Sequence, residues 1–522
     1  MTDSATKSSG ATYTKAEAGY FEKRSLKRTA GVRGLWGIGI AAVISGDFSG
    51  WNPGIGQAGW GGLLIATLVV IVMYFTMIFS IGEMSAAMPH TGGAYSFSRA
   101  ALGPWGGFIT GLAETIEYVV TTAVVVLFSA GYLNSILATL TNGAVDFSED
   151  GSNTIWILWI VLYVLFVGLN SLGASVGFRF ALIVAIISMG ILLVFAVTAF
   201  ANGAVDFSRL FDIEPVDGNT TFLPFGAVGI LFALPFAIWF FLGIEELPLA
   251  AEEATNPTKD IPRASVWGVV TLAFFGLLVL FLNPAVTGAQ ALTESPGLDE
   301  PLLVGFATFL PPEAAAILSL FALIGLLASL QGIMYAYGRN MYSLSRAGYY
   351  PKFLSLTGRK HQTPWVALVV GAVIGFIILS AVTLVSQNVP DLAGAAIGII
   401  LFIAVFGAVI SYMMQMVSFI VLRRKFPTAK RPYKSPTGVA GAVVAGIIAF
   451  LAFVGIILAP DFRLAVITFV IIFAVGIVIF ALVGRHRLVL SPEEEYALSG
   501  GLHGDPEAEG YDAMESEVFG SK

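Results

Sequence analysis

The sequence predicts an all-α membrane protein with twelve transmembrane helices. Of the 522 residues, 57% are hydrophobic and only 12% are charged, whereas about a quarter of the residues of a soluble domain are charged. The mean hydropathy is +0.84. Apolar runs of roughly twenty residues, the length that crosses a bilayer, recur along the chain, and the basic residues between them gather on one side. These observations place the chain among polytopic membrane proteins.

The predicted helices divide the chain into five parts. The helices begin near Gly31, Trp60, Trp105, Thr154, Val176, Phe225, Ser265, Glu313, Pro364, Leu392, Val439 and Leu464. We expect an N-terminal tail over residues 1–30, a first inverted repeat over 31–201, a second over 224–424, two further helices over 437–485 and an acidic C-terminal tail over 486–522. The acidic, Gly-rich segment from Ser491 onward is typical of a solvated, disordered tail.

The basic residues predict the orientation of the helices. When successive loops are assigned alternately to the two sides, all of the 27 Lys and Arg residues except Arg209 and Arg463 fall on the side of the N-terminus. Basic loops stay in the cytoplasm, so both termini are expected to be cytoplasmic, in a bacterial plasma membrane. The opposite loops are acidic, which favours a cationic solute.

A charged side chain interrupts the first predicted helix. The run Ile44-Ser45-Gly46-Asp47-Phe48-Ser49-Gly50-Trp51-Asn52-Pro53 places a carboxylate, two glycines and a proline inside an apolar stretch. A carboxylate at membrane depth is costly and is kept where it faces a partner, an ion or a substrate. Broken backbone is tolerated in a bilayer only where it lines a cavity or is buried in protein. The run therefore predicts the binding site of a transporter.

A second interruption lies in the sixth predicted helix. It covers Trp239-Phe240-Phe241-Leu242-Gly243-Ile244-Glu245-Glu246-Leu247-Pro248. Breaks in helices one and six are what two five-helix repeats of inverted topology place face to face at the centre of the membrane. Gly and Pro are common in membrane helices, so a single interruption would be a weak signal. Two breaks at corresponding positions, each beside a carboxylate, are more specific.

The third predicted helix carries a polar stripe. Glu114, Glu117, Tyr118 and Thr121 are spaced by three and four residues, which puts them on one face of a helix. Such a face points toward the substrate or, alternatively, pairs with a polar group of another helix for packing. Tyr335 and Tyr337 in the eighth predicted helix are either core aromatics or cavity lining.

Enzymatic chemistry has no support in the sequence. The chain has no cysteine, and its four histidines are scattered without the spacing of metal ligands. No nucleophile elbow or phosphate-binding loop is visible. We therefore expect no catalytic residues, no metal site and no cofactor.

Three sequence blocks carry a family resemblance. The run from Ile81 to Phe97, followed by Leu102-Gly103-Pro104-Trp105, resembles the second-to-third helix signature of the amino acid/polyamine/organocation (APC) transporters. Gly243-Ile244-Glu245 leading to Ala254-Thr255-Asn256-Pro257, and the block from Arg339 to Pro351, resemble further segments of these carriers. The resemblance covers most of the chain and implies a LeuT-like fold, a 5+5 inverted repeat with broken helices 1 and 6.

The first break departs from the amino acid carriers of this superfamily. Those carriers usually have a Gly-Ser-Gly-like segment whose free N–H groups hold the substrate carboxylate, whereas this chain has Asp47 there. A fixed negative charge repels a carboxylate and attracts an ammonium. The pattern around Asp47, together with Glu114-Thr115-Ile116-Glu117-Tyr118, resembles the ethanolamine permease branch.

The resemblance implies import of ethanolamine or a similar small amino alcohol by ion-coupled symport. Asp47 and Glu117 supply the counter-charge, aromatic residues wall the site, and Asn52 or Tyr118 binds the hydroxyl. Glu245 couples protons or instead caps the broken backbone, and Glu83 stabilises the cytoplasmic gate. The expected substrate-binding residues are Ser45, Gly46, Asp47, Phe48, Trp51, Asn52, Glu117, Tyr118, Trp239, Phe240 and Phe241, and the expected coupling or gating residues are Glu245, Glu114 and Glu83.

Several alternatives stay open at this point. The coupling ion is H⁺, or Na⁺ bound near Ser188, because Ser188 stands where many proton-coupled members carry a lysine. The nearest alternative function is an amino acid, choline or polyamine permease of the same superfamily, and a membrane enzyme or a channel is more remote. The expected partners are a small amine and membrane lipid, with no nucleic acid, and the sequence leaves the oligomeric state open.

Overall fold

The computed structural model describes residues 6–8, 11–14, 20, 23–24, 26–148, 154–294, 299–389, 396–491 and 494–495. The helices are α1 (Val32–Val43), α2 (Pro53–Ala87), α3 (Gly93–Leu140), α4 (Trp156–Ser171), α5 (Ala174–Ala201), α6 (Ala227–Trp239), α7 (Pro257–Thr287), α8 (Pro301–Ala307), α9 (Pro312–Arg346), α10 (Trp365–Asn388), α11 (Ala396–Lys425), α12 (Gly438–Leu458) and α13 (Arg463–Leu482). Shorter elements are the strands β1 (Thr6–Ser8), β2 (Ala11–Thr14) and β3 (Leu488–Val489), and the 3-10 helices η1 (Ile44–Asp47), η2 (Phe207–Phe211), η3 (Ile244–Ala250), η4 (Gln290–Thr293), η5 (Lys352–Ser355), η7 (Pro460–Phe462) and η8 (Gly484–His486).

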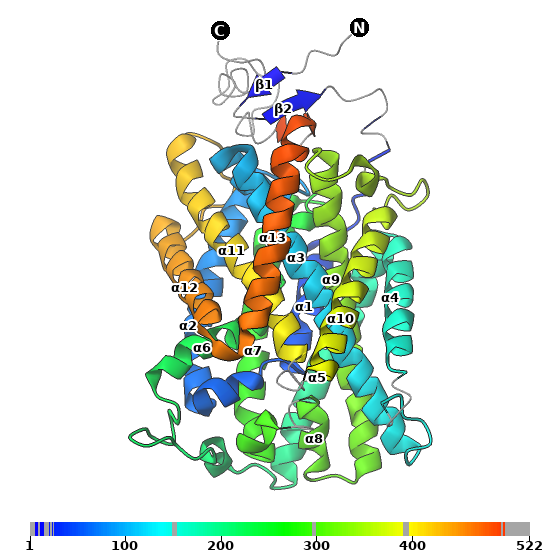
Figure 1. Ribbon diagram of the computed structural model, residues 1–522, viewed down its shortest axis with the longest axis vertical. Helices are drawn as coiled ribbons and strands as arrows, with labels where there is room; N and C mark the ends of the chain where they lie inside the picture. The colour runs from blue at the N-terminus through cyan, green and yellow to red at the C-terminus, as the bar shows by residue number, and fades with distance from the viewer. Residues whose placement is uncertain are drawn as a thin grey trace.

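The described residues form one bundle of apolar helices (Figure 1). Ten segments are long and apolar enough to cross a membrane, and α4, with 16 residues, is a shorter apolar helix. The predicted all-α membrane class is therefore confirmed. The count of twelve spans and the inverted repeat stay predictions.

Three helices begin well before their predicted starts. One is α7, which begins at Pro257 rather than near Ser265; the other two contain a kink. α2 begins at Pro53 rather than near Trp60, and α3 begins at Gly93 rather than near Trp105. Each contains a glycine with positive φ just before the predicted start, Gly59 (φ 71°) in α2 and Gly103 (φ 78°) in α3. The helix changes direction at that glycine, because the left-handed region costs glycine little. In both helices, the apolar run in the sequence covers only the part of the helix after the kink.

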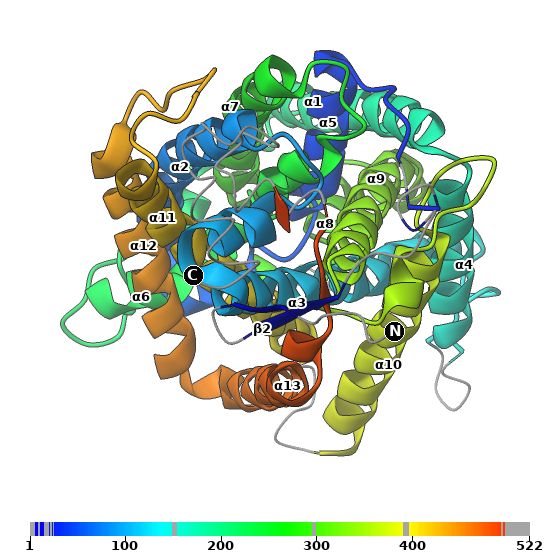
Figure 2. The same cartoon turned by 90° about the horizontal axis from the view of Figure 1, so that it is seen from above.

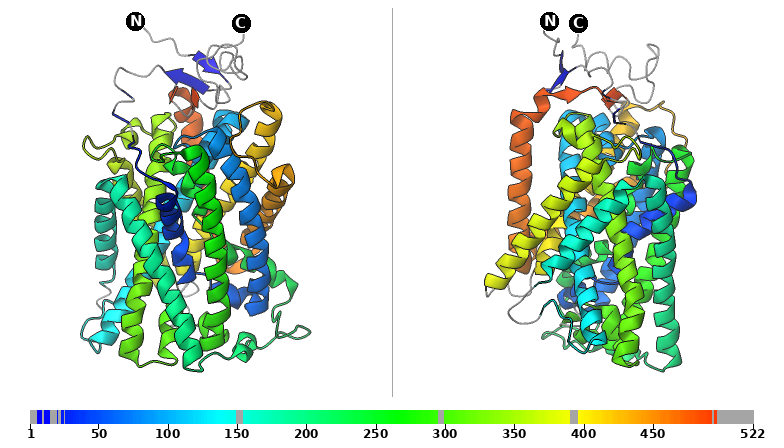
Figure 3. Two further views of the ribbon diagram at one scale, coloured as in Figure 1. Left: turned by 180° about the vertical axis from the view of Figure 1, so that it is seen from behind. Right: turned by 90° about the vertical axis from the view of Figure 1, so that its right-hand side faces the viewer.

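Helix α3 crosses the centre of the bundle (Figure 2). α3 packs against α9, α10 and α11, while α1 packs against α5, α7 and α9, and α2 packs against α6 and α7. α12 and α13 lie along the outside (Figure 3). The described residues of the candidate site therefore come from elements that pack on one another at the core.

The first and last described parts of the chain, strands β1 and β2 and strand β3, lie at one end of the bundle, which we call the terminal face (Figures 1 and 3). A three-stranded sheet forms there in the order β1-β2-β3, with β2 and β3 parallel and Tyr13 paired with Leu488. Ser491 and Glu494 are fully buried. The prediction of a solvated tail is wrong for these two residues, because the carboxylate of Glu494 is bound by Arg99. Residues 496–522 of the predicted tail lie outside the described residues.

Candidate functional site

The first break is a short stretch of 3-10 helix and turn between α1 and α2. α1 ends at Val43, η1 covers Ile44–Asp47, and α2 begins at Pro53. Ser45 is held by α9, because Ser329 Oγ donates to Ser45 Oγ at 2.8 Å. The carbonyl of Phe48, left without a helical partner, accepts a hydrogen bond from the Tyr132 hydroxyl at 2.9 Å. The backbone N–H of Ser45 also donates to Ser329 Oγ at 3.4 Å. Side chains of α3 and α9 therefore bond to the broken backbone.

The second break begins where α6 ends at Trp239. Gly243 has a φ of +110°, which turns the chain into η3. The ring of Phe240 stacks on Trp51 with 5.7 Å between centroids, and the ring of Phe241 packs on Tyr74 at 5.0 Å. The aromatic residues predicted as a wall are thus buried around the breaks.

The two breaks are in direct contact, as the sequence predicted. The indole N–H of Trp239 donates to the carbonyl of Ser49 at 3.0 Å. A methyl group added to Gly46 would lie 2.5 Å from the carbonyl oxygen of Trp239, and one added to Gly50 would lie 2.5 Å from the indole nitrogen. Gly46 and Gly50 are therefore required for the close approach.

Four carboxyl groups gather between α3 and η3. Glu114 and Glu117 come from α3, and Glu245 and Glu246 from η3, and all four are buried. Glu117 is close enough to the other three for their charges to interact. Neither oxygen of Glu117 or of Glu246 accepts a hydrogen bond from an amide, hydroxyl or basic group among the described residues. Buried carboxylates without such donors are costly, so this carboxyl cluster marks the centre of the candidate site.

The members of the carboxyl cluster differ in their neighbours. Glu114 accepts long hydrogen bonds from Ser411 (3.3 Å) and Tyr118 (3.4 Å). Both carboxylate oxygens of Glu245 accept the backbone N–H of Gly243 at 3.1 Å. This is the capping contact that the sequence left open beside proton coupling, and it is compatible with either role.

Asp47 lies apart from the carboxyl cluster. It is 1% exposed, and neither oxygen has a hydrogen-bond partner among the described residues. A methyl group on Gly276 of α7 would lie 3.6 Å from Asp47 Oδ1 and 3.2 Å from the ring of Phe240. Asp47 therefore faces α7, whereas the charged neighbours of Glu117 belong to α3 and η3. The structure records no contact between the two carboxylates that the sequence assigned to one ammonium.

The remaining predicted residues have structural partners. The amide of Asn52 donates to the carbonyl of Leu292 at 2.9 Å. The hydroxyl of Ser188, the expected neighbour of a sodium ion, donates to the carbonyl of Val184 on its own helix at 2.7 Å. Sodium coupling stays a prediction.

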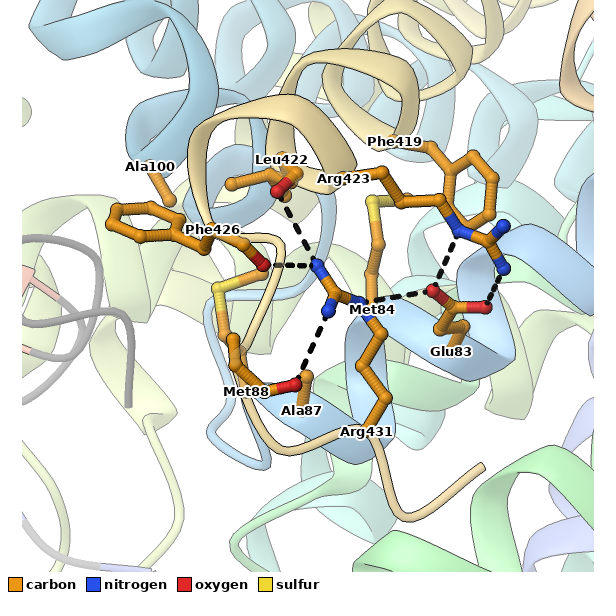
Figure 4. A pocket seen from close by; sticks show the side chains of 11 residues that line it. Glu83, Met84, Ala87, Met88, Ala100, Phe419, Leu422, Arg423, Phe426 and Arg431 are labelled. Atoms are coloured by element: carbon orange, nitrogen blue, oxygen red, sulfur yellow. Dashed lines mark hydrogen bonds and ion pairs between the residues drawn. The ribbon is translucent and has the colours of Figure 1, made fainter. Parts of the chain in front are cut away.

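Glu83 lies at the terminal face in a network of basic groups (Figure 4). Arg423 pairs with it through two contacts, the shorter being 2.6 Å, and Arg431 pairs with it at 3.1 Å. The backbone N–H of Ser435 donates to the same carboxylate at 2.7 Å. These contacts join the end of α2 to the end of α11 and to the segment between α11 and α12, beside a cavity of about 40 Å³. The gating role of Glu83 stays a prediction.

Two further ion pairs join the segment after η3 to α9. Glu253 pairs with Arg339 at 2.8 Å, and Glu252 pairs with Arg346 at 2.5 Å. Burial would raise the pKa of Glu252, but Arg346 and His90 hold it below its ordinary value. With the contacts of Glu83, these pairs join α2 to α11 and the segment after η3 to α9.

The sequence missed several residues of the site. Glu246 was not assigned a role, although its place next to Glu245 in the break was a usable signal. The hydroxyls of Tyr74 (α2) and Tyr412 (α11) are 2.9 Å apart and close to Glu245 and Glu117. No local pattern distinguishes these tyrosines from core aromatics.

Membrane-length helices with two broken segments meeting beside buried carboxyl groups define a membrane transport protein. The family model "Amino acid permease" matches residues 34–489. The chain therefore belongs to the amino acid permease family, whose members are transporters and not enzymes.

Named relatives match between two thirds and nine tenths of the chain. The branched-chain amino acid permease BcaP of Bacillus subtilis (strain 168) is 26% identical over 482 residues, which is 90% of this chain and 96% of that protein. The methylthioribose transporter of the same organism is 24% identical with the same coverage. The gamma-aminobutyric acid permease of the same organism is 24% identical over 359 residues, which is 67% of this chain and 72% of that protein.

Proposed function

We propose that this permease is a secondary carrier that imports a small amine and binds its ammonium group beside the carboxyl cluster. The observation that carries the proposal is the accumulation of Glu114, Glu117, Glu245 and Glu246 in the core. Arg339 is a basic neighbour of Glu246, but its guanidinium is hydrogen-bonded to Glu253. A cationic substrate or a shared proton would balance the excess negative charge.

The relatives favour an amino acid as the amine. BcaP and the gamma-aminobutyric acid permease are named for amino acids. Family members differ in substrate, however, since the methylthioribose transporter is named for a different kind of solute.

The site itself favours an amine without a carboxylate, such as ethanolamine. A substrate carboxylate near the first break would approach Asp47, which has no partner among the described residues. Like charges brought together in a water-poor site repel strongly. Ethanolamine or a similar amino alcohol is therefore our specific candidate, and an amino acid is the alternative, ahead of choline and polyamines.

We further propose proton coupling through Glu117 and Glu245, two interacting carboxyl groups on different elements. Such a pair shares a proton more readily than either group binds one alone. Sodium coupling is the competing proposal. The basic loops near the terminal face support a cytoplasmic location for that face and for both termini.

Counterflow of labelled ethanolamine into proteoliposomes tests the substrate. Leucine, gamma-aminobutyrate and choline are added as competitors, and vesicles without protein are the blank. We expect exchange that ethanolamine inhibits and leucine does not. Exchange of labelled leucine with no exchange of ethanolamine would assign the protein to the amino acid alternative.

Imposed gradients test the coupling. Accumulation is measured with a proton gradient in sodium-free buffer and with a sodium gradient at equal pH on both sides. Accumulation with protons alone is the expected result, and accumulation that requires sodium would contradict it.

A further inference from the structure

The buried carboxylate of Glu494 joins three separate parts of the chain at the terminal face. Arg99 Nε of α3 donates to it at 2.5 Å, and the hydroxyl of Tyr95, one turn earlier in α3, donates at 2.9 Å. The hydroxyl of Tyr349, just beyond α9, donates at 3.1 Å, and that of Tyr13 in β2 donates at 2.9 Å. Glu494 is 0% exposed.

The backbone of β3, which precedes Glu494, packs closely on the turn after α9. Val489 N–H donates to the carbonyl of Ala347 at 2.9 Å. Gly348 has a φ of +86°, and a methyl group there would lie 2.5 Å from the carbonyl oxygen of Arg487. Gly348 is therefore required in the turn after α9, because a side chain there would collide with the backbone of residues 487–489.

The segment that precedes α1 is hydrogen-bonded to other parts of the terminal face. Residues 23–30 lead directly into α1. The Arg24 guanidinium donates to Ser355 Oγ at 2.7 Å, and the backbone N–H of Thr29 donates to the carbonyl of Glu253 at 2.8 Å. Farther toward the N-terminus, Glu494 holds strand β2 through Tyr13, and the hydroxyl of Tyr20 donates to the carbonyl of Arg346 at 3.0 Å. Opening of the terminal face requires the half of α1 next to it to move away from α9, and these contacts oppose that movement.

Burial of Glu494 favours a reversible contact. Removing a carboxylate and a guanidinium from water costs several kcal/mol, and their attraction with added hydrogen bonds offsets much of this. The net free energy of the contact is therefore small, although it contains several hydrogen bonds. Such a balance suits a contact that forms and breaks during function.

We propose that β3, Ser491 and Glu494 form an autoinhibitory latch, in which Glu494 fastens strand β2 to α3 and to Tyr349 beyond α9 and keeps the terminal face closed. The latch must release for that face to open. The inference does not depend on which amine is carried, because its tests follow the opening of the terminal face and not uptake.

A single reporter cysteine tests the latch in the full-length protein. The chain has no cysteine, so Thr91→Cys, at a buried position between α2 and α3, is the only labelled site. Maleimide labelling is followed in detergent with Glu494 intact, with Glu494→Gln, and with Glu495→Gln as the matched control. We expect about tenfold faster labelling with Glu494→Gln, the effect of one lost charge-assisted hydrogen bond. Equal rates in the Glu494→Gln and Glu495→Gln proteins would overturn the latch.

A cross-link tests the same proposal with Glu494 unchanged, which keeps it falsifiable if Glu494→Gln does not assemble. Ala347→Cys and Val489→Cys are joined by a short bifunctional thiol reagent, and deuterium exchange is measured over residues 84–92 and 251–256. We expect slower exchange in the cross-linked protein and recovery after cleavage of the reagent. Unchanged or faster exchange after cross-linking would contradict the proposal.

Discussion

Trp239 donates its indole N–H to the carbonyl of Ser49 across the two broken segments, at 3.0 Å. Ser49 lies between η1 and α2, where its carbonyl has no helical partner. The indole of Trp239, at the end of α6, supplies the hydrogen bond. The same ring was predicted as part of an aromatic wall for the amine. A hydrogen-bonding role and a cation–π role predict different results for different substitutions.

Trp239→Phe removes the donor and keeps an aromatic face. We expect a loss of about 1 kcal/mol in stability from the missing hydrogen bond, with amine affinity nearly unchanged. Trp239→Leu removes the π-face as well and should weaken affinity about tenfold. Thermal unfolding and isothermal calorimetry separate the two effects. Equal affinity in the Phe and Leu variants would show that the ring does not contact the amine.

Gly46→Ala should disrupt the contact between the breaks. The added methyl group would lie 2.5 Å from the carbonyl oxygen of Trp239, which is backbone and cannot rotate away. We expect a loss of about 1–3 kcal/mol, measured as a lower unfolding temperature, together with loss of transport. Gly190→Ala in α5, where nothing lies within 4 Å, is the control and should leave both properties unchanged. Normal transport by the Gly46→Ala protein would show that the breaks can separate without cost.

Asp47→Asn should abolish amine transport without weakening the protein, because it removes the negative charge that attracts the ammonium at the first break. The side chain keeps its shape, and removal of a buried charge without a partner relieves a desolvation cost. Thermal unfolding should therefore show equal or higher stability, while counterflow falls to the level of empty vesicles. Transport at the normal rate would remove Asp47 from the binding site.

Glu245→Gln separates coupling from capping. The amide oxygen of glutamine can still accept the N–H of Gly243, so the cap is kept while the titrating proton is lost. If Glu245 carries the symported proton, exchange should survive and accumulation under a pH gradient should fail. Parallel measurements of exchange and accumulation decide this, and accumulation retained by the variant would leave only the capping role.

Glu300 predicts a pH dependence on the face opposite the termini. It lines a cavity of about 220 Å³ with Ser135 and Asp299. Burial raises its pKa to about 7 from 4.5, the Ser135 hydroxyl opposes the rise, and Asp299 adds to it. The folded protein therefore favours the protonated carboxyl, and stability is lost as the pH rises from about 4.5 through 7, by at most roughly 3 kcal/mol.

Glu300→Gln should remove the loss of stability at rising pH, because glutamine does not titrate. The variant should unfold at the same temperature as the parent at pH 4 and at a higher temperature at pH 8. Asp206→Asn is a control of opposite sign, because the hydroxyl and backbone N–H of Ser208 lower the pKa of Asp206. A constant difference between Glu300→Gln and the parent across the pH range would refute the assignment.

The breaks were predictable because their signals are local. A carboxylate, glycines and a proline inside an apolar run identify Asp47 and the segment around Gly243 without any knowledge of neighbouring helices. Their contact followed from the positions of the two helices in the chain. The starts of α2 and α3 were placed too late, since hydropathy does not report a glycine kink.

The rest of the site depends on packing between distant segments. Asp47 and Glu117 were assigned to one ammonium because both are intramembrane carboxylates, but the sequence does not specify which neighbour each side chain faces. The burial of Glu494 was missed for a similar reason. It belongs to an acidic segment by composition, and its partner Arg99 is 395 residues away in the chain.

The pairing of β2 with β3 also sets an order for biosynthesis. Tyr13 and Glu494 are separated by 481 residues, so the ribosome has synthesised all the described helices, α1 to α13, before strand β2 can acquire its parallel neighbour. The sheet is consequently one of the last contacts to form. A nascent chain stopped before Leu488 leaves β2 without its β3 partner, and protection of Tyr13 from proteolysis would report that translation has passed α13.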